Sequence, residues 1–476
     1  MAYRFGERRQ TVMFPASVEA YVAADDPVRA YDAFVEQLDF GDLGIEVDSG
    51  QVGPPAYDPK AMLKLLVYGY SYGLRSSRKL ERATCHNVSF IWLLGGLQPD
   101  HKTIARFRRD HRAALARVLK QCARLCIELN LIAGNTLFVD GTKIGANASL
   151  ARSWTKKKGE RRLAKIERRI AAILAECEAT DRAEQGADSP VHMPAELHDA
   201  RTLKEKIQGV LRELAESAST SINTTDRDCR PMKGRQGSLA GYNLQAVVDD
   251  HQGLIVQADV VNDQNDVRQF ANQIEQANEV VGGTCAVACG DAGYANTAVL
   301  KVLDEQGITV IVPSQDQARH TPRGAFDKSE FVYDAAQDCY RCPAGEILRY
   351  RKTDVQAGKK TYQITDPLIC HRCEFFGACT QAKQGRAIVT LLDDAVKRRL
   401  EAQYVKPESQ EVYRRRKERA ELPFGHLKHN LGVRSFVLRG LSGVRAEAGI
   451  LATCFNLARM ITILGVSGLL QAWRVA

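Results

Sequence analysis

The sequence predicts an α/β protein with a mixed five-stranded sheet, preceded by an all-α domain and interrupted by two insertions. From Gly241 onward, apolar runs of strand length alternate with helical patterns, which is typical of an α/β domain. The first 135 residues show helical periodicity only. A second helical segment and a Cys-rich segment separate the predicted strands, and each is the size of an insertion.

A chain of 476 residues is too long for one simple domain, and about two to four units are expected. The pattern suggests six segments. They are a helical domain at 1–135, a first strand at 136–150, a helical hairpin at 151–218, an α/β core at 236–315, a Cys-rich insertion at 316–386 and a helical end at 387–476.

Composition excludes several classes of protein. With 45% hydrophobic and 26% charged residues, the chain resembles an ordinary globular protein. The polar start lacks the apolar core of a signal peptide, and no run approaches 18 apolar residues, so no membrane span is expected. Thirteen scattered cysteines argue against a secreted disulfide framework. We therefore expect a cytoplasmic protein with no membrane partner.

Positive charge is concentrated in two places, although the net charge is only +9. Residues 413–445 contain nine Lys or Arg and two Glu, and residues 102–120 contain seven Lys or Arg and one Asp. Clusters of this kind favour a phosphate-backbone partner. A solvated helix face explains either cluster alone equally well.

The N-terminal and inserted segments are predicted to be helical. Asp58-Pro59 starts one helix, Ser76 or Ser77 caps a second, and a long basic helix runs from about 103 to 129. A helical packing domain and a DNA-docking module both suit this region. Apolar residues recur at spacings of three and four on both sides of a segment containing Pro190 and Pro194, which predicts an antiparallel helical hairpin and a candidate contact surface.

The α/β core is predicted element by element. Strands are expected at 242–248, 254–261, 285–289 and 308–312, and helices at 266–281 and 296–305. With the first strand, the order is β-β-β-α-β-α-β. It places Asp140 at the end of the first strand, Asp291 just after the fourth, and Glu421 on a helix after the fifth.

Three carboxylates are the candidate catalytic residues. Asp140 and Asp291 follow apolar runs and are flanked by glycines, which allow close approach of backbone or ligand. Carboxylates that converge from separate elements can hold two Mg²⁺ ions for phosphoryl transfer. Taken singly, an Asp-Gly after a strand is usually a turn.

Glu421 lies among cations on a predicted helix. Lys417 and Lys428, four residues before it and seven after it, share its helix face. A surface ion pair is the common explanation of such a glutamate. Pro423 and Gly425 make the helix locally irregular, which favours a functional reason for the stretch.

Together these motifs resemble the DDE transposases of bacterial insertion sequences, and most closely the insertion-sequence eleven-eighty-two group. The resemblance extends over nearly the whole chain. Its motifs are Gly53–Pro59, Gly69–Arg78, Pro99–Arg108, Asp140–Ser149 and Gly241–Asp249, with Asp291 and the Tyr413–Lys428 stretch.

The resemblance implies a ribonuclease H-like catalytic domain in which Asp140, Asp291 and Glu421 ligate two Mg²⁺ (or Mn²⁺) ions. It implies cleavage and strand transfer of double-stranded DNA, at terminal inverted repeats and target, by a homodimer in the synaptic complex. The alternatives are a catalytically inactive DNA-binding descendant and a nuclease that cuts without joining.

The resemblance also suggests DNA contacts near Glu421 from Tyr413, Arg416, Lys417 and Lys428, and Lys428 would contact a phosphate. The related signature has Arg four residues before the Glu and Tyr three before that Arg. Here Lys417 holds the Arg place, while Tyr413 and Arg416 are each displaced by one position.

Two Cys-x-x-Cys pairs predict a structural Zn²⁺ site. Cys339, Cys342, Cys370 and Cys373 offer four thiolates for a tetrahedral ion, and Cys379 could replace one of them. The 27 residues between the pairs exceed the commonest ribbon spacing. Free cytosolic thiols are the alternative.

Several other acids are assigned to structural positions. Asp266 is predicted to be a helix N-cap, and Asp249 and Asp250 are predicted to lie in a hairpin turn.

Overall fold

The computed structural model describes residues 17–47, 56–183, 195–216, 220–234, 237–319 and 324–474. Gly53–Pro55 of the first motif and Pro190 and Pro194 lie outside these ranges. The chain divides into two compact units. The first contains the chain up to Asp266, then Asn272–Cys285 and the part from Arg415 on, and the second contains Val267–Ala271 and Ala286–Arg414.

The N-terminal part of the first unit is helical, as predicted. Its elements are η1 (Val18–Tyr21), α1 (Pro27–Glu36), α2 (Phe40–Leu43), α3 (Pro59–Ser71), α4 (Ser77–His86), α5 (Val88–Leu93), α6 (His101–Asp110) and α7 (Arg112–Glu128). The N-cap prediction for α3 is confirmed, since the Asp58 carboxylate accepts from the Lys60 N–H at 2.9 Å.

The long basic helix predicted at 103–129 is wrong in one respect, because α6 and α7 are separate helices. His111, between them, has φ −106° and ψ 28° and so leaves helical geometry. Arg108 is also not on an exposed basic face. It is buried, and its guanidinium donates to the Tyr70 hydroxyl at 3.1 Å and the Arg75 carbonyl at 2.7 Å.

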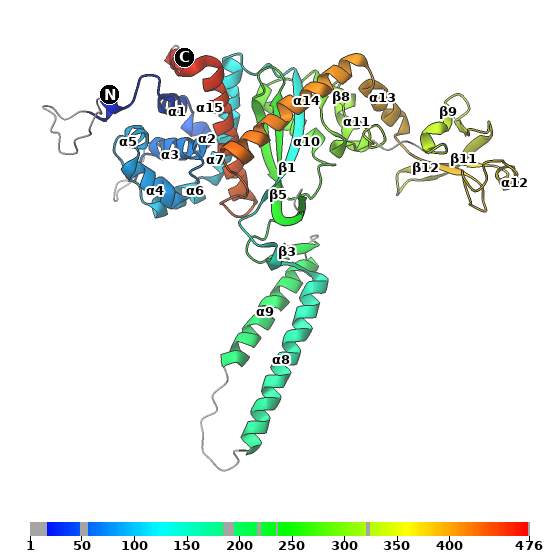
Figure 1. Cartoon of the computed structure of the whole chain (residues 1–476), viewed down its shortest axis with the longest axis horizontal. Coiled ribbons are helices and arrows are strands. Elements are labelled where there is room, and N and C mark those ends of the chain that lie inside the picture. Colours follow the sequence, from blue (N-terminus) through cyan, green and yellow to red (C-terminus); the bar gives the residue numbers. More distant parts are fainter. Residues whose placement is uncertain are drawn as a thin grey trace, which may run out of the picture. The chain divides into compact units, whose positions relative to one another are not determined.

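Helix α15 (Leu441–Arg474) packs against α1, α3 and α7 in this unit (Figure 1). By length and composition alone it could cross a membrane, with a mean hydropathy of 1.6 over its most apolar window. Within the fold, 61% of that window is buried, as in the core helix of a globular protein. The left-handed Gly465 (φ 71°) interrupts the helix near its end.

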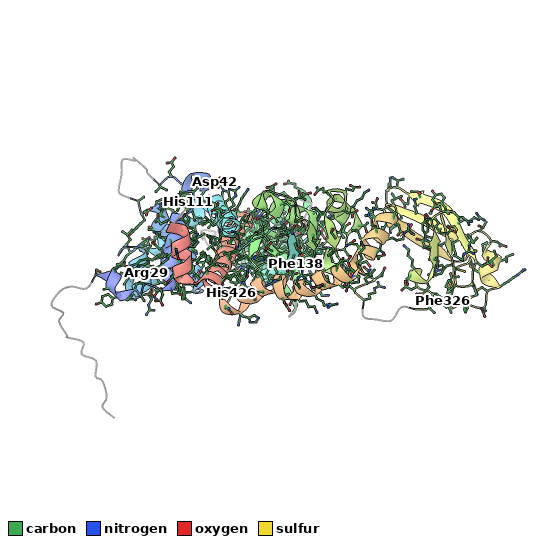
Figure 2. All side chains as sticks on the ribbon, turned by 90° about the horizontal axis from the view of Figure 1, so that it is seen from above. Arg29, Asp42, His111, Phe138, Phe326 and His426 are labelled. Atoms are coloured by element: carbon green, nitrogen blue, oxygen red, sulfur yellow. The ribbon has the colours of Figure 1, made fainter. Side chains whose placement is uncertain are left out.

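The strands of the first unit are antiparallel. They are β1 (Thr136–Gly145), β4 (Arg230–Gly234), β5 (Gly237–Asp249) and β6 (Ile255–Val261), and β5 pairs with the other three. The predicted β5–β6 hairpin is confirmed. Phe138 of β1 is fully buried within the layer of strands (Figure 2). On the sheet's helical side, Val248 and Ile255 pack with Leu119 of α7 and Phe455 of α15.

The predicted helical hairpin is present as α8 (Lys156–Ala183) and α9 (Ala195–Glu216), which lie side by side (Figure 1). A short ribbon closes its base, formed by β2 (Ser153–Thr155) and β3 (Ser221–Asn223). The hairpin has its own small core, which contains Trp154, Ile207, Val210, Leu214 and Ile222. Burial of this apolar surface explains how an insertion of two helices is stabilised.

The second unit contains a parallel pair of strands, β7 (Val287–Cys289) and β8 (Thr309–Ile311), with η3 (Ala292–Tyr294), α11 (Thr297–Glu305) and α13 (Asp394–Tyr404). Helix α10 (Phe270–Val281) leads out of this unit and α14 (Pro407–Gly425) leads back into the first. The chain therefore has the mixed parallel and antiparallel character expected of its α/β fold.

The Cys-rich part of the second unit forms a five-stranded antiparallel sheet in the order β13-β12-β11-β10-β9. Its elements are η4 (Lys328–Glu330), β9 (Val332–Asp334), β10 (Cys339–Arg341), β11 (Ile347–Asp354), β12 (Lys359–Ile364), α12 (Pro367–His371) and β13 (Ala387–Leu391). Since β13 completes the sheet, this part extends beyond the expected end at 386. Its core contains Phe331, Tyr340, Leu348, Tyr362 and Ile388.

Candidate active site

Asp140 lies in the middle of β1, opposite Ala246 of β5. The prediction that it ends the strand is wrong, because antiparallel pairing with β5 continues to Gly145. Its carboxylate accepts from the Gly141 N–H at 2.8 Å and lies 3.9 Å from Nη1 of Arg416. Both side chains are largely buried, with 16% of Asp140 and 8% of Arg416 exposed. Asp140 is thus a carboxylate held beside a cation at the edge of solvent.

Helix α14 approaches β1 through a defined face. Arg416, Ala420, Phe424 and Leu427 are buried and recur at spacings of four, four and three, which is one side of a helix. Beyond this face, the Lys428 ammonium donates to the Thr142 hydroxyl. Because Asp140 and Thr142 are two residues apart on a strand, they lie on the same face of β1.

Glu421 lies between these two contacts, five residues after Arg416 and seven before Lys428, and its side chain is exposed. Lys417 is also exposed, and one helical turn separates it from Glu421. The contacts of Arg416 and Lys428 with β1 keep this stretch of helix near the strand that carries Asp140.

The expected irregularity after Glu421 is real. Helix α14 continues through Pro423 and then widens into the π-helical turn η5 (His426–Asn430). Proline removes one helical N–H, and single π-helical turns recur at functional sites. His426 packs edge-on against Phe455 with ring centroids 5.5 Å apart, and burial lowers the pKa of His426. A packing role for His426 is the one that the contacts support.

On the opposite face of β1, Asp266 is the acceptor for three side-chain donors. Its Oδ1 accepts from Lys143 at 3.1 Å, from Asn243 at 2.6 Å and from Gln245 at 2.7 Å. The N-cap prediction for Asp266 is wrong, since α10 begins at Phe270. No local sequence pattern indicated this cluster, because its donors come from β1 and β5, far from Asp266 in the chain.

Gly141 makes the Asp266 cluster possible. A Cβ at this position would lie 2.3 Å from Gln245 Nε2 and 2.9 Å from Asp266 Oδ1. Side-chain atoms of Gln245 and Asp266 therefore occupy the space beside the backbone that follows Asp140.

Asp249 and Asp250, the two acids predicted for the hairpin turn, have different partners. Asp249 ends β5 and is buried, and its carboxylate accepts from the Gly134 N–H at 2.7 Å and the His251 N–H at 2.9 Å. Asp250 accepts from the Arg415 guanidinium at 2.8 Å.

Asp291, in the second unit, is the N-cap of η3 immediately after β7. Its Oδ1 accepts from the Gly293 N–H at 2.8 Å. The preceding Gly290 is required by packing, since a Cβ there would lie 2.6 Å from the ring of Phe270. The strand and the turn thus fix the direction of this carboxylate, as predicted for a residue that follows a strand.

Tyr413, the last of the predicted DNA-binding residues, also belongs to the second unit. Its ring packs edge-on against Tyr404, with centroids 5.1 Å apart and an interplanar angle of 84°. This contact gives Tyr413 a role in packing α13 against α14.

Four of the five cysteines in and beside the small sheet line one cavity, and the fifth lies elsewhere. Cys342, Cys370, Cys373 and Cys379 line this cavity, whereas Cys339 is buried on β10, where its Sγ lies 3.9 Å from the side-chain oxygen Oε1 of Gln337. Burial raises the pKa of the Cys379 thiol, and the neighbouring Cys370, Cys342 and Cys373 act in the same direction. The structure therefore groups Cys379 with the predicted set and leaves Cys339 out.

Among the residues that the structure describes, no group of three or more His, Cys, Asp or Glu side chains is assembled to hold a metal ion. Carboxylates with access to solvent, such as Asp140 and Asp291, are nevertheless oxygen ligands of the kind that Mg²⁺ prefers.

Comparison with known families gives two matches. Residues 16–110 match the family described as Transposase domain (DUF772), and residues 341–461 match the family described as Transposase DDE domain. The second match includes Glu421 and Lys428 but neither Asp140 nor Asp291. No curated protein matches the chain. The two matches support a DDE transposase, which is a class of enzyme that acts on DNA.

Proposed function

We propose that this chain is the transposase of an insertion sequence, which binds the ends of the element and catalyses metal-dependent DNA cleavage and strand transfer. The observation that carries the proposal is the placement of α14 along β1. Contacts from Arg416 and Lys428 to Asp140 and Thr142 flank Glu421, within a segment that matches a transposase DDE domain.

In this proposal, Asp140, Asp291 and Glu421 hold two Mg²⁺ (or Mn²⁺) ions in a ribonuclease H-like site. Bound there, the ions would supply the activation of the attacking oxygen and the stabilisation of the leaving oxygen that phosphoryl transfer needs. A strand, a capped turn and a helix carry the three carboxylates, so each ligand is positioned by a different element.

Arg416 has a positioning role in this proposal. It is buried beside Asp140, which suits a residue that orients a carboxylate better than one that contacts DNA. Its guanidinium lies 3.9 Å from the Asp140 carboxylate, so the opposite charges can hold that carboxylate in one direction.

Exposed cations near Glu421 offer a surface for the DNA backbone. Lys417 and Lys428 are the candidates on α14 and η5, and the Thr142 hydroxyl orients the Lys428 ammonium. In the N-terminal helices, Lys102, Arg106 and Arg109 remain exposed while Arg108 does not. The DNA would be the terminal inverted repeats and the target, and pairing of two ends implies a homodimer.

The test uses the DNA that flanks the gene as substrate. Asp140→Asn, Asp291→Asn and Glu421→Gln should each lower strand cleavage by about 10²- to 10³-fold or more, the scale seen when one preorganised group of an active site is lost. Binding of the element ends should persist in all three variants. Replacing Mg²⁺ by Ca²⁺ should allow binding without cleavage.

Three other outcomes would contradict parts of the proposal. If the wild-type protein binds the ends and never cuts them with Mg²⁺ or Mn²⁺, the chain is a catalytically inactive DNA-binding protein. If it cuts and yields no strand-transfer product, it is a nuclease. If Glu421→Gln cleaves at the wild-type rate, Glu421 is not a ligand.

A further inference from the structure

Four of the five cysteines near the small sheet line a single cavity. The cavity has a volume of about 30 Å³, and its walls include Cys342, Cys370, Cys373 and Cys379. Phe326, labelled in Figure 2, contributes an apolar wall. Cys339 is only three residues from Cys342, but strand pairing of β10 with β9 and β11 holds it elsewhere.

Backbone N–H groups already point at two of these sulfurs. Cys342 Sγ accepts from the Glu346 N–H at 3.3 Å, and Cys370 Sγ accepts from the Arg386 N–H at 3.4 Å. The first contact comes from a tight turn in which Gly345 has φ 88° and its N–H donates to the Cys342 carbonyl at 2.8 Å. Hydrogen bonds of this kind stabilise charge on a sulfur and orient metal-binding thiolates.

The cation Arg386 lies beside the cavity, where it can offset the negative charge of bound thiolates. The Arg386 guanidinium donates to the Cys379 carbonyl at 2.9 Å and the Phe326 carbonyl at 3.0 Å, and it lies 5.0 Å from the centre of the Phe331 ring. Zn²⁺ bound by four thiolates carries a net charge of −2. Arg386 would offset part of that charge inside a largely apolar region.

We propose that Cys342, Cys370, Cys373 and Cys379 bind one structural Zn²⁺ ion, and that Cys339 is not a ligand. The four thiols line the same cavity but do not have the tetrahedral arrangement of a bound site. Among the described residues, no group of three or more potential ligands is close enough to hold a metal ion. Binding would release the four thiol protons and draw each sulfur to about 2.3 Å from the ion. With four protein ligands the site is closed, and it therefore has no open position for catalysis.

The site would tie the segment around α12 to the β10–β11 turn. That segment, from Pro367 to Cys379, has only a five-residue helix of its own. The sheet beside it has a small core of five buried side chains, and small cores commonly need a metal to be stable. Zinc content can be measured without DNA, so failure of the zinc site and failure of the proposed DNA chemistry are distinguishable.

The test is the zinc content of the purified full chain, measured by mass spectrometry for the wild type and single variants. Wild type should contain about one Zn²⁺ per chain, the stoichiometry of a single four-ligand site. Cys379→Ser should lose most of it, and the matched control Cys339→Ser should keep it. With Co²⁺ in place of Zn²⁺, wild type and Cys339→Ser should share the visible spectrum of a tetrahedral thiolate site.

A second variant separates loss of a ligand from loss of the fold. Cys379→His keeps a group that can ligate zinc, so it should retain the ion with an altered Co²⁺ spectrum. The proposal is overturned by a wild-type chain that takes up no zinc, by Cys339→Ser losing as much as Cys379→Ser, or by Cys379→His losing the ion.

Discussion

The guanidinium of Arg416 lies 3.9 Å from the carboxylate of Asp140, and both side chains are largely buried. Arg416→Gln removes the cation from a carboxylate with little access to water. The free energy of unfolding should fall by about 1–3 kcal/mol, the usual effect of removing one partner of a buried polar contact. Chemical denaturation of the chain without DNA measures this change.

The neighbouring Lys417 provides the control. Its side chain is exposed, so Lys417→Gln should change the free energy of unfolding by no more than about 0.5 kcal/mol. Equal effects of the two variants would show that Arg416 does not stabilise the site through Asp140.

Asp266 offers a test of the opposite face of β1. Asp266→Ala leaves Lys143, Asn243 and Gln245 without their shared acceptor and should cost about 1–3 kcal/mol of stability. Cleavage should also fall, since the strand that carries Asp140 loses its support. The exposed Asp25 of the same unit is the control, and Asp25→Ala should leave thermal unfolding nearly unchanged. A wild-type melting temperature for Asp266→Ala would contradict the role given to this cluster.

Glu447 gives a prediction for pH. This buried residue of α15 accepts from the Arg75 guanidinium at 2.8 Å and from the Val437 and Leu438 N–H groups at 2.8 and 2.9 Å. Burial raises the pKa of Glu447 above its ordinary 4.5, against the effect of these donors. A raised carboxyl pKa means that the folded state binds the proton more tightly than the unfolded state. Its contribution to stability is therefore complete below about pH 4.5 and is lost as pH rises through the folded pKa.

Glu447→Gln removes this titration. The stability of wild type relative to the variant should decrease as pH rises from 4 upward, measured by denaturation at each pH. Arg445→Gln is the control. Arg445 stays charged over this pH range and its side chain is 43% exposed, so its effect should vary little. A wild-type advantage that grows with pH would instead show that Arg75 and the two N–H groups lower the Glu447 pKa.

Local patterns were sufficient to predict much of the fold. The β5–β6 hairpin follows from two apolar runs around Asp249–Gly253, and the α8–α9 hairpin follows from apolar spacings of three and four. Both features are encoded by neighbours in the chain. Asp266 was misassigned because an acid before a helix is usually a cap, and its real donors lie on strands more than twenty residues away.

The cysteines show the same limit. Spacing alone pairs Cys339 with Cys342, but Cys339 lies inside β10, and its direction is fixed by pairing with Asp334 and Arg349. Cys342 follows the strand in a turn and is free of that constraint. Which thiols share a cavity is therefore decided by strand register, which the Cys-x-x-Cys pattern does not encode.

Lys428 provides a prediction about DNA. Its ammonium donates to the Thr142 hydroxyl, two residues beyond Asp140 on the same face of β1. A phosphate held near Asp140 would therefore lie within reach of this charge. Lys428→Ala should weaken binding of the element ends and should lower the slope of log affinity against log salt by about one, the value for one phosphate contact. Lys428→Arg keeps the charge and should preserve the slope. Binding measured across a salt series separates the two, and an unchanged slope for Lys428→Ala would assign Lys428 to the packing of η5 against β1 alone.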